Sequence, residues 1–148
     1  MTSALLQRLT DEYAYPLLGE EDVDDFVREH GHVVLFFTGD PLRIGETADV
    51  AIILPELMKV FGDVLQPAIV ARTAERPLQL RFRFSAYPAL VFLDRGGYLG
   101  AISKVQDWND YLREIARIMA LEPSEPPPYR LPGCVTTGAG TNGSRSAS

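Results

Sequence analysis

Apolar and polar positions along the chain follow two periods, one typical of helices and one typical of strands. Helical spacing predicts helices at residues 4–13, 20–30, about 47–61 and about 106–121. Short apolar runs bounded by turn residues predict strands at 32–39, 67–73, 89–94 and 98–103. The last two strands flank the sequence RGG, so we expect them to form a hairpin.

Local signals mark positions in three of these helices. Gly31 directly follows the second helix, where glycine commonly ends a helix. Thr47 has the side chain of an N-cap residue, and Asp49 lies in the first turn, where an acid suits the helix dipole. Pro55 falls inside the same helix and predicts a kink. In the last helix we expect Trp108 to be in the core or half-buried.

The segment at 75–86 fits two structures. Its apolar residues alternate as they do in a strand, but a short helix also fits. In the strand interpretation, the arginines between them form either a contact stripe or the exposed side of an edge strand. The alternating residues are Leu78, Leu80, Arg81, Phe82, Arg83 and Phe84.

The order of the predicted elements indicates an α/β protein with a central mixed sheet flanked by helices. We expect residues 1–19 to form a helical extension and residues 20–122 to form one domain. Residues 123–148 are first rich in proline and then in glycine and serine, which predicts an extended and then a disordered tail. A chain of 148 residues with 46% hydrophobic side chains can bury a core without disulfides.

Charge is distributed unevenly along the chain. Residues 1–63 contain 13 acidic and 4 basic residues, a net of −9, and residues 64–148 contain 7 and 10, a net of +3, which sum to −6. The overall acidity argues against nucleic acid as a partner, because phosphate binding needs a basic patch. An acidic first half suits a basic partner, although a solvated surface that keeps the protein soluble explains it equally well.

Few residues in the sequence are candidates for a disulfide or for binding a metal. Cys134 is the single cysteine, which excludes an internal disulfide and a cysteine zinc site. His30 and His32, with no cysteine beside them and no further histidine, make a poor metal site. The sequence also lacks a P-loop, a G-x-G-x-x-G after a strand and an H-E-x-x-H motif, so we expect no metal and no cofactor. The N-terminus lacks a secretory pattern, and no apolar run approaches the roughly 20 residues of a membrane span. We therefore expect a cytoplasmic protein without membrane insertion.

A Tyr-Pro pair stands directly before the predicted strand at 89–94. Proline at the start of a strand gives up only one ladder hydrogen bond, and in a tight turn it can adopt a cis bond. The apolar strand, the loop, the helix that contains Pro55 and the sequence YPALVF together resemble the thioredoxin fold over about residues 20–121. The resemblance implies a thioredoxin-like fold in which Tyr87 and Pro88 lie beside the start of the third helix.

The cysteine pair of thioredoxins is missing. Counting back from Pro55 by the thioredoxin spacing places the C-x-x-C positions on Thr47-Ala48-Asp49-Val50. Disulfide exchange needs an attacking thiolate and a resolving thiol, which threonine and valine cannot provide. An enzymatic alternative would use Thr47 as the nucleophile, but no histidine or other base lies nearby in sequence to activate it. We therefore expect that the protein is not an enzyme.

Four stretches resemble a narrower family: LLQRL, VVLFFTGDPLR, ADVAIILPEL and RFRFSAYPALVFLDRGGYLGAISKVQDWNDY. Over residues 1–121 the chain is similar to the hydrogenase expression/formation proteins of the HupG/HyaE type. The resemblance implies a non-catalytic accessory chaperone for uptake nickel–iron hydrogenase. Such a protein would bind the small-subunit precursor through its twin-arginine signal peptide before export. Other hydrogenase accessory proteins are further implied partners.

A basic and partly apolar signal suits a site that combines acids with an apolar groove. The main candidates surround the missing cysteine positions and the Tyr-Pro pair: Asp40, Glu46, Thr47, Asp49, Val50, Tyr87 and Pro88. A second candidate is the acidic start of the second helix: Glu20, Glu21, Asp22, Asp24 and Asp25.

These candidates also have purely structural explanations. Asp40 and Glu46 flank a loop, where capping and solvation account for acidic residues. Asp49 suits the first turn of a helix, and the run at 20–25 suits a solvated helix face. A thioredoxin-like interaction module with an unrelated partner therefore stays open as an alternative.

Overall fold

The structure is a computed structural model that describes residues 4–40, 45–124 and 126. Its centre is a five-stranded sheet with the strand order β1-β3-β2-β4-β5. The strands are β1 (Leu17–Leu18), β2 (His32–Phe37), β3 (Gln66–Val70), β4 (Ala89–Asp94) and β5 (Gly97–Ser103). The first three strands are parallel, whereas β4 is antiparallel to both β2 and β5. The predicted mixed sheet is therefore confirmed.

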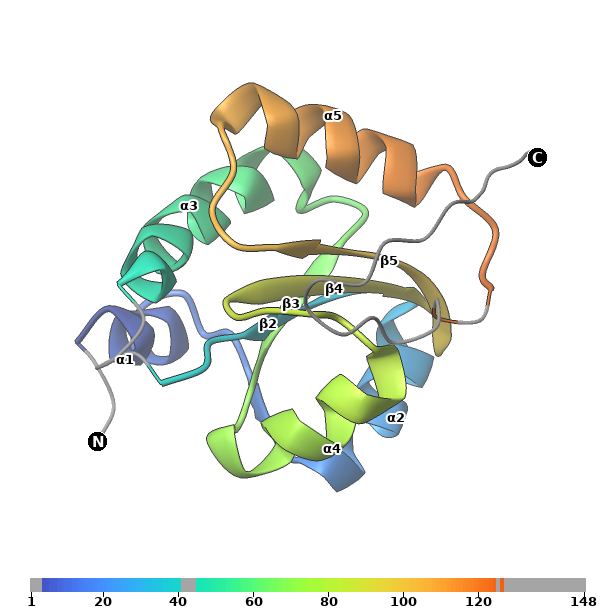
Figure 1. The fold of residues 1–148 in the computed structure, drawn as a ribbon, viewed down its shortest axis with the longest axis horizontal. Helices are drawn as coiled ribbons and strands as arrows, with labels where there is room; N and C mark the ends of the chain where they lie inside the picture. Colours follow the sequence, from blue (N-terminus) through green and yellow to red (C-terminus); the bar gives the residue numbers. More distant parts are fainter. Residues whose placement is uncertain (1–3, 41–44, 125, 127–148) are drawn as a thin grey trace.

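Helices cover both faces of this sheet (Figure 1). They are α1 (Ala4–Asp11), α2 (Glu20–His30), α3 (Glu46–Phe61), α4 (Arg72–Phe82) and α5 (Trp108–Met119). The helices α1, α3 and α5 pack on one face, and α2 and α4 pack on the other. The four helices predicted from apolar spacing are all present, because that spacing corresponds to buried faces.

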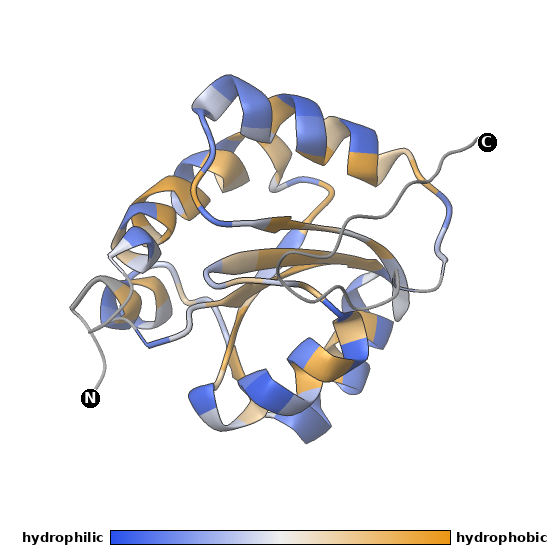
Figure 2. Cartoon of the chain, viewed as in Figure 1, coloured by the Kyte–Doolittle hydropathy of each residue, from blue (hydrophilic) through white to orange (hydrophobic). Residues whose placement is uncertain are grey.

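The central strands are buried on both sides, which explains their unbroken apolar runs. In β2, Val34 and Phe36 face α1, α3 and α5, while Val33, Leu35 and Phe37 face α2 and α4. Figure 2 shows these apolar strands between helices that carry polar residues on their outer sides. Each fully buried side chain of this size contributes about 1.5–3 kcal/mol relative to an exposed one. Burial on both faces of the sheet therefore fixes the positions of the strand ends.

The segment at 75–86 lies largely in the helix α4, so the strand alternative is wrong. Leu78 and Phe82 are buried against the sheet, whereas Leu80 between them is 58% exposed. A strand would place all three on one side, but a helical period turns Leu80 away from the other two. Arg81 donates a hydrogen bond from Nη2 to Asp24 of α2 at 2.9 Å. The arginine therefore links two helices and does not form part of an edge-strand stripe.

The strand β1 has no counterpart among the predicted elements. With two residues it is too short to show a period. It is held by hydrogen bonds of 2.8 Å from Ile69 N–H to Pro16 O and from Ala71 N–H to Leu18 O. The helix α1 contributes two buried leucines to the core, Leu6 and Leu9. Residues 4–18 are therefore packed against the rest of the domain.

Two local predictions need correction. Thr47 is not the N-cap of α3, because Gly45 takes that position and the Thr47 side chain is buried within the first turn. Trp108 is 42% exposed, so the core alternative for this residue is wrong. The inner face of α5 is formed instead by Tyr111 and Ile115, which are 0% and 1% exposed.

The β4–β5 hairpin forms as predicted. Its turn consists of Arg95 and Gly96, whose φ angles of 52° and 94° are both positive, a pattern that matches the twist of paired strands. Beyond α5 the chain returns to the outer edge of β5, where Ser124 N–H donates to Tyr98 O at 2.9 Å. Most of the predicted disordered tail lies outside the described residues. Among the described residues, no helix combines the length and apolar character of a membrane span.

Candidate functional site

The main predicted site lies at one edge of the sheet (Figure 1). Here the parallel strands β1, β2 and β3 end and the helices α2, α3 and α4 begin. Open α/β sheets commonly bind ligands at this edge. The loop that follows β2 starts at Thr38, and Pro88 lies next to it because Ala89 pairs with Phe37. The structure therefore places the β2 loop and the Tyr-Pro pair side by side.

The two positions that carry cysteine in thioredoxins are closed in this chain. Thr47 is 1% exposed, and its hydroxyl donates to Thr38 O at 2.5 Å. Val50 is 2% exposed and belongs to the core beneath α3. A hydroxyl that donates to a backbone carbonyl has no base to take its proton. Neither position therefore presents a nucleophile to a substrate.

The Tyr87–Pro88 peptide bond is cis, as the thioredoxin resemblance implies. Pro88 is buried, and its carbonyl oxygen accepts the Lys104 N–H at 2.7 Å. The Tyr87 hydroxyl donates to Gln79 Oε1 of α4 at 3.1 Å. Burial raises the pKa of Tyr87, and the nearby Glu75 carboxylate raises it further. Tyr87 is thus a neutral phenol fastened to α4.

The carboxylate of Glu75 on α4 belongs to this edge, although it was not among the predicted site residues. It is 4% exposed and accepts the Gly39 N–H at 3.0 Å and the Thr38 hydroxyl at 3.3 Å. The Arg72 Nε lies 3.1 Å from its other oxygen. Burial raises the pKa of Glu75, while the Gly39 N–H and the Arg72 charge oppose that shift. Glu75 therefore ties the start of α4 to the loop after β2.

Two of the predicted acids also hold loops at this edge. Asp40 Oδ1 lies 3.8 Å from Arg72 Nη1. Glu46 Oε1 accepts the Val105 N–H at 3.0 Å and so joins the start of α3 to the loop after β5. Asp49 is exposed and forms no ion pair with a described residue. Of these predicted acids, Asp49 is therefore the one best placed to meet a basic partner.

The second predicted patch lies on α2, across the sheet from α3. Asp22 caps α2 by accepting the backbone N–H that precedes the helix at 2.9 Å. Asp24 and Asp25 each pair with an arginine. Glu20 and Glu21 are exposed at the start of the helix. The structure therefore places the second patch across the sheet from α3, on the face against which Tyr87 of the main patch packs.

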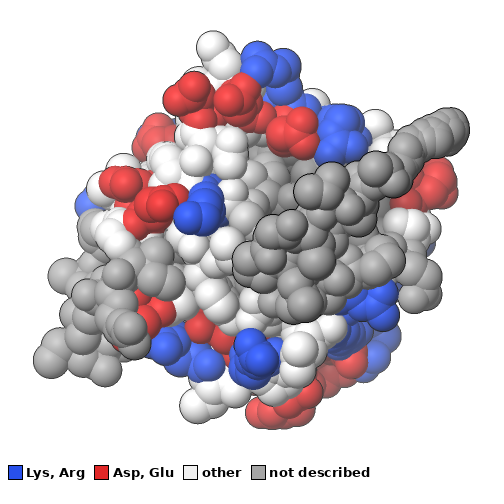
Figure 3. All heavy atoms as spheres, viewed as in Figure 1, with Lys and Arg blue, Asp and Glu red and all other residues white. Residues whose placement is uncertain are grey.

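Acidic and basic side chains are interspersed on the face of the molecule shown in Figure 3. Several exposed acids pair with a basic residue three or four positions away, as in Arg8–Glu12, Glu56–Lys59 and Glu114–Arg117. Exposed pairs of this kind contribute about 0–1 kcal/mol. The acidity of the first half of the chain therefore does not gather into one continuous patch on this face.

The described part of the chain contains no group of three or more side chains that suits a metal ion. His30 Nδ1 lies 2.9 Å from Phe26 O, and His32 Nε2 lies 3.6 Å from Asp94 Oδ2. The two histidines thus have different partners despite their closeness in sequence. At this edge of the sheet, the carboxylates and hydroxyls described above already bond other groups of the same chain.

The fold is thioredoxin-like. The crystal structure of mitochondrial thioredoxin 3 from Saccharomyces cerevisiae, in its oxidised form, matches with a TM-score of 0.58 at 12% sequence identity, over 71% of this chain and 95% of that one. Because Thr47 and Val50 replace the cysteines, the fold and the site define a thioredoxin-like protein without the thioredoxin redox pair.

Closer relatives identify the family. The family described as "Hydrogenase-1 expression protein HyaE" matches residues 5–111. The hydrogenase expression/formation protein HoxO of Azotobacter vinelandii is 48% identical over 132 residues, which cover 89% of this chain and 87% of that protein. HupG of Rhizobium leguminosarum bv. viciae is 39% identical over 120 residues, covering 78% and 80%.

A solved structure agrees with these sequences. The crystal structure named for the hydrogenase expression/formation protein hupG from Rhodopseudomonas palustris CGA009 is 43% identical and has a TM-score of 0.51, over 71% of this chain and 95% of that one. The present chain belongs to the HyaE family, and it is a hydrogenase expression/formation accessory protein. The resemblance read from the sequence is therefore confirmed at this level.

Proposed function

We propose that this protein is a non-catalytic chaperone for the maturation of uptake nickel–iron hydrogenase. It binds the small-subunit precursor in the cytoplasm, through the twin-arginine signal peptide, before export. Other hydrogenase accessory proteins are further partners in this proposal. The observation that carries it is the closure of the redox positions, at Thr47 and Val50, in a chain of a hydrogenase expression family.

The closed site supports binding over turnover because its polar groups are already bonded. The Thr47 hydroxyl, the Glu46 carboxylate and the Glu75 carboxylate each bond a backbone group of the same chain. A general base or nucleophile has to be within reach of a substrate atom. Groups that are bonded internally instead fix the shape of the edge, which suits recognition of another protein.

The acidic character of the chain fits a basic signal peptide. Complementary charge accelerates encounter and sets orientation more than it sets affinity. Salt screens exposed charges, with a Debye length of about 10 Å at 0.1 M ionic strength. Binding of the precursor is therefore expected to slow and weaken as salt rises.

A calorimetric titration tests the proposal. The full-length chain is titrated with the small-subunit precursor, with and without its signal peptide, at low and high salt. We expect binding that requires the signal and weakens with salt. Binding that ignores the signal would move the site to the mature subunit, and no binding in either form would contradict the proposed function.

The enzymatic alternative has its own inexpensive assay. Reduction of insulin in the presence of dithiothreitol reports thiol–disulfide exchange. We expect the rate with this protein to equal the rate with dithiothreitol alone. Turnover above that rate would mean that the protein acts catalytically, even though Thr47 is buried and bonded.

A further inference from the structure

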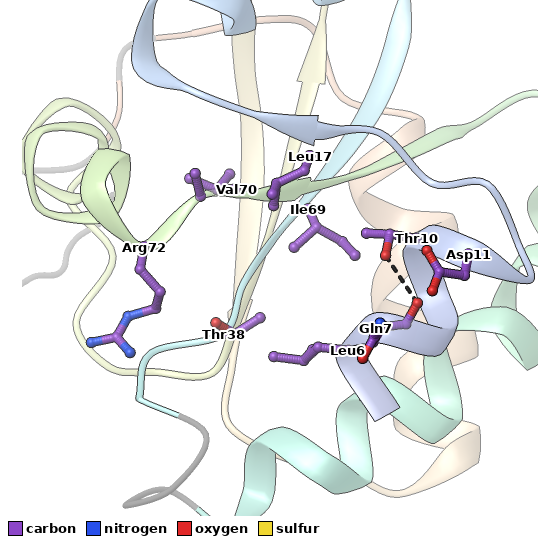
Figure 4. A pocket seen from close by; sticks show the side chains of 10 residues that line it. Leu6, Gln7, Thr10, Asp11, Leu17, Thr38, Ile69, Val70 and Arg72 are labelled. Atoms are coloured by element: carbon purple, nitrogen blue, oxygen red, sulfur yellow. Dashed lines mark hydrogen bonds between the residues drawn. The ribbon is translucent and has the colours of Figure 1, made fainter. Parts of the chain in front are cut away.

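A groove of about 570 Å³ opens between α1 and the edge strand β1 (Figure 4). Its apolar side chains include Leu6, Leu17 and Ile69. In Figure 4, Leu17 and Ile69 point into the space between β1 and α1, with Asp11 and Arg72 on opposite sides of it. None of these residues was among the site residues predicted from the sequence.

The charges around the groove are unequal. Arg72 lies within 4 Å of two carboxylates, Glu75 at 3.1 Å and Asp40 at 3.8 Å, so its positive charge is matched inside the protein. Asp11, at the other side, is exposed and forms no ion pair with a described side chain. Of the two charged residues that line the groove, Arg72 is thus paired, whereas Asp11 has no ion-pair partner among the described side chains. A basic group is therefore the complementary charge for the Asp11 side of the rim.

One apolar side chain of the groove, Leu17, is open to solvent, whereas Leu6 and Ile69 are 6% and 3% exposed. Leu17 is 60% exposed, although it neighbours a buried core. It also belongs to the outermost strand of the sheet. The carbonyl oxygens of Pro16 and Leu18 accept hydrogen bonds from β3. Because backbone groups alternate in direction along a strand, the N–H and C=O of Leu17 point to the side of β1 that has no neighbouring strand. Such an edge can accept an extended segment of another chain.

We propose that this groove binds an extended segment of a partner protein that carries an apolar and a basic side chain. The apolar side chain covers Leu17, and the basic side chain lies beside Asp11. The segment's backbone runs along the open side of β1. This inference rests on the proposed function, since a twin-arginine signal has both kinds of side chain. It places the contact at α1 and β1 instead of at the start of α3.

Substitutions at the two places separate these sites. Leu17→Glu puts a charge into the apolar part, and Leu80→Glu is its matched control, because Leu80 is 58% exposed and lies on α4. Asp11→Lys reverses the charge of the rim, and Asp49→Lys does the same at the start of α3. We expect Leu17→Glu and Asp11→Lys each to weaken precursor binding about tenfold or more. The Leu80→Glu control should bind like the parent protein. Loss of binding in Asp49→Lys but not in Asp11→Lys would overturn the groove assignment and place the contact at the start of α3.

Mapping on the unmodified chain gives a second readout that does not depend on any variant. The full-length protein, labelled with ¹⁵N, is titrated with a synthetic peptide in which two arginines precede a leucine-rich run. We expect amide shifts to concentrate at α1, β1 and the end of β3. Shifts that concentrate at the start of α3 would overturn the groove assignment, and so would an absence of peptide binding.

The two experiments together distinguish failure of the groove from failure of the proposed function. Precursor binding that survives Leu17→Glu and Asp11→Lys would overturn the groove and leave the function intact. A peptide that maps to the groove, with no binding of the precursor, would support the groove and contradict the function. Absence of both kinds of binding would overturn both proposals.

Discussion

Two neighbouring regions at the same edge of the sheet differ in what their polar groups bond. At the start of α3, the Thr47 hydroxyl and the carboxylates of Glu46 and Glu75 all bond backbone groups of this chain. In the groove beside α1, Asp11 has no ion pair with a described residue and Leu17 is largely exposed. Bonded groups stabilise a conformation, whereas unpaired charges and exposed apolar side chains remain available to a partner. In this protein the region that carries the cysteines in thioredoxins is therefore closed, and the accessible surface lies beside it.

Removing the Glu75 side chain should produce the largest effect on stability. Glu75→Ala leaves the buried Gly39 N–H without its acceptor and Arg72 without its closest partner. An unpaired buried donor costs about 1–3 kcal/mol, so we expect a loss of that size in the free energy of unfolding. Urea denaturation measures it.

Glu56→Ala is the matched control for this prediction. Glu56 also lies on a helix and pairs with a basic residue three positions away, Lys59, at 3.0 Å, but both side chains are exposed. The control should cost no more than about 0.5 kcal/mol. Equal losses in the two variants would mean that the contacts of Glu75 do not hold this edge.

Removal of the Thr47 hydrogen bond should reduce the free energy of unfolding by a smaller amount. Thr47→Val keeps the shape of the side chain but removes the donor to Thr38 O. We expect the free energy of unfolding to fall by about 1 kcal/mol, the net contribution of one buried hydrogen bond. Thr10→Val removes an exposed hydroxyl of α1 that bonds Gln7 O, and it should change stability less. If Thr47→Val left the free energy of unfolding unchanged, this hydrogen bond would not be what keeps the position closed.

The elements that the sequence predicts correctly are those whose burial follows a local period. The run at 32–37 is apolar at every position from Val33 because β2 is buried on both faces, and α5 shows its inner face through residues such as Ile115. The strand β1 is too short for any period to appear. In α4, Leu80 is an exposed leucine, and counting it as a core residue makes the helix look like a strand.

The residues of the site were harder to predict because their roles depend on contacts between distant parts of the chain. Glu75 is buried by a loop whose bonding residue, Gly39, is 36 positions away in sequence. The groove combines α1 with β1 and the end of β3, and no motif in the sequence joins these segments. One local signal was available: Arg72 and Glu75 stand three apart, the spacing of a helical ion pair. That pair would have identified α4, though not the burial of its carboxylate.

The raised pKa of Glu75 predicts a dependence of stability on pH with a definite sign. The pKa of this carboxyl is raised mainly by burial, so between its unfolded and folded values the folded state binds more protons than the unfolded state. The contribution of Glu75 to the free energy of unfolding therefore falls as pH rises through that window. Glu75→Gln removes this dependence while keeping an oxygen that accepts the Gly39 N–H.

Urea denaturation of both proteins, at several values between about pH 4 and pH 7, measures the difference. The free energy of unfolding of Glu75→Gln minus that of the parent should increase from the acidic to the neutral end. Because all other carboxylates are common to both proteins, their titration cancels in the difference. A difference that decreases with pH would mean that Arg72 and the backbone N–H outweigh burial and lower the pKa of Glu75.

The smallest expected effect is on stability at the groove, and it separates the two regions most sharply. Leu17 is 60% exposed, so Leu17→Glu exposes little new apolar surface and should change the free energy of unfolding by no more than about 0.5 kcal/mol. The same substitution is expected to reduce precursor binding strongly, whereas Thr47→Val should reduce stability and leave binding nearly unchanged. Parallel urea and titration measurements on the two variants test this crossover. If Leu17→Glu instead lost stability in proportion to binding, the groove would be part of the packed core of the domain, and its exposed leucine would have no separate role in recognition.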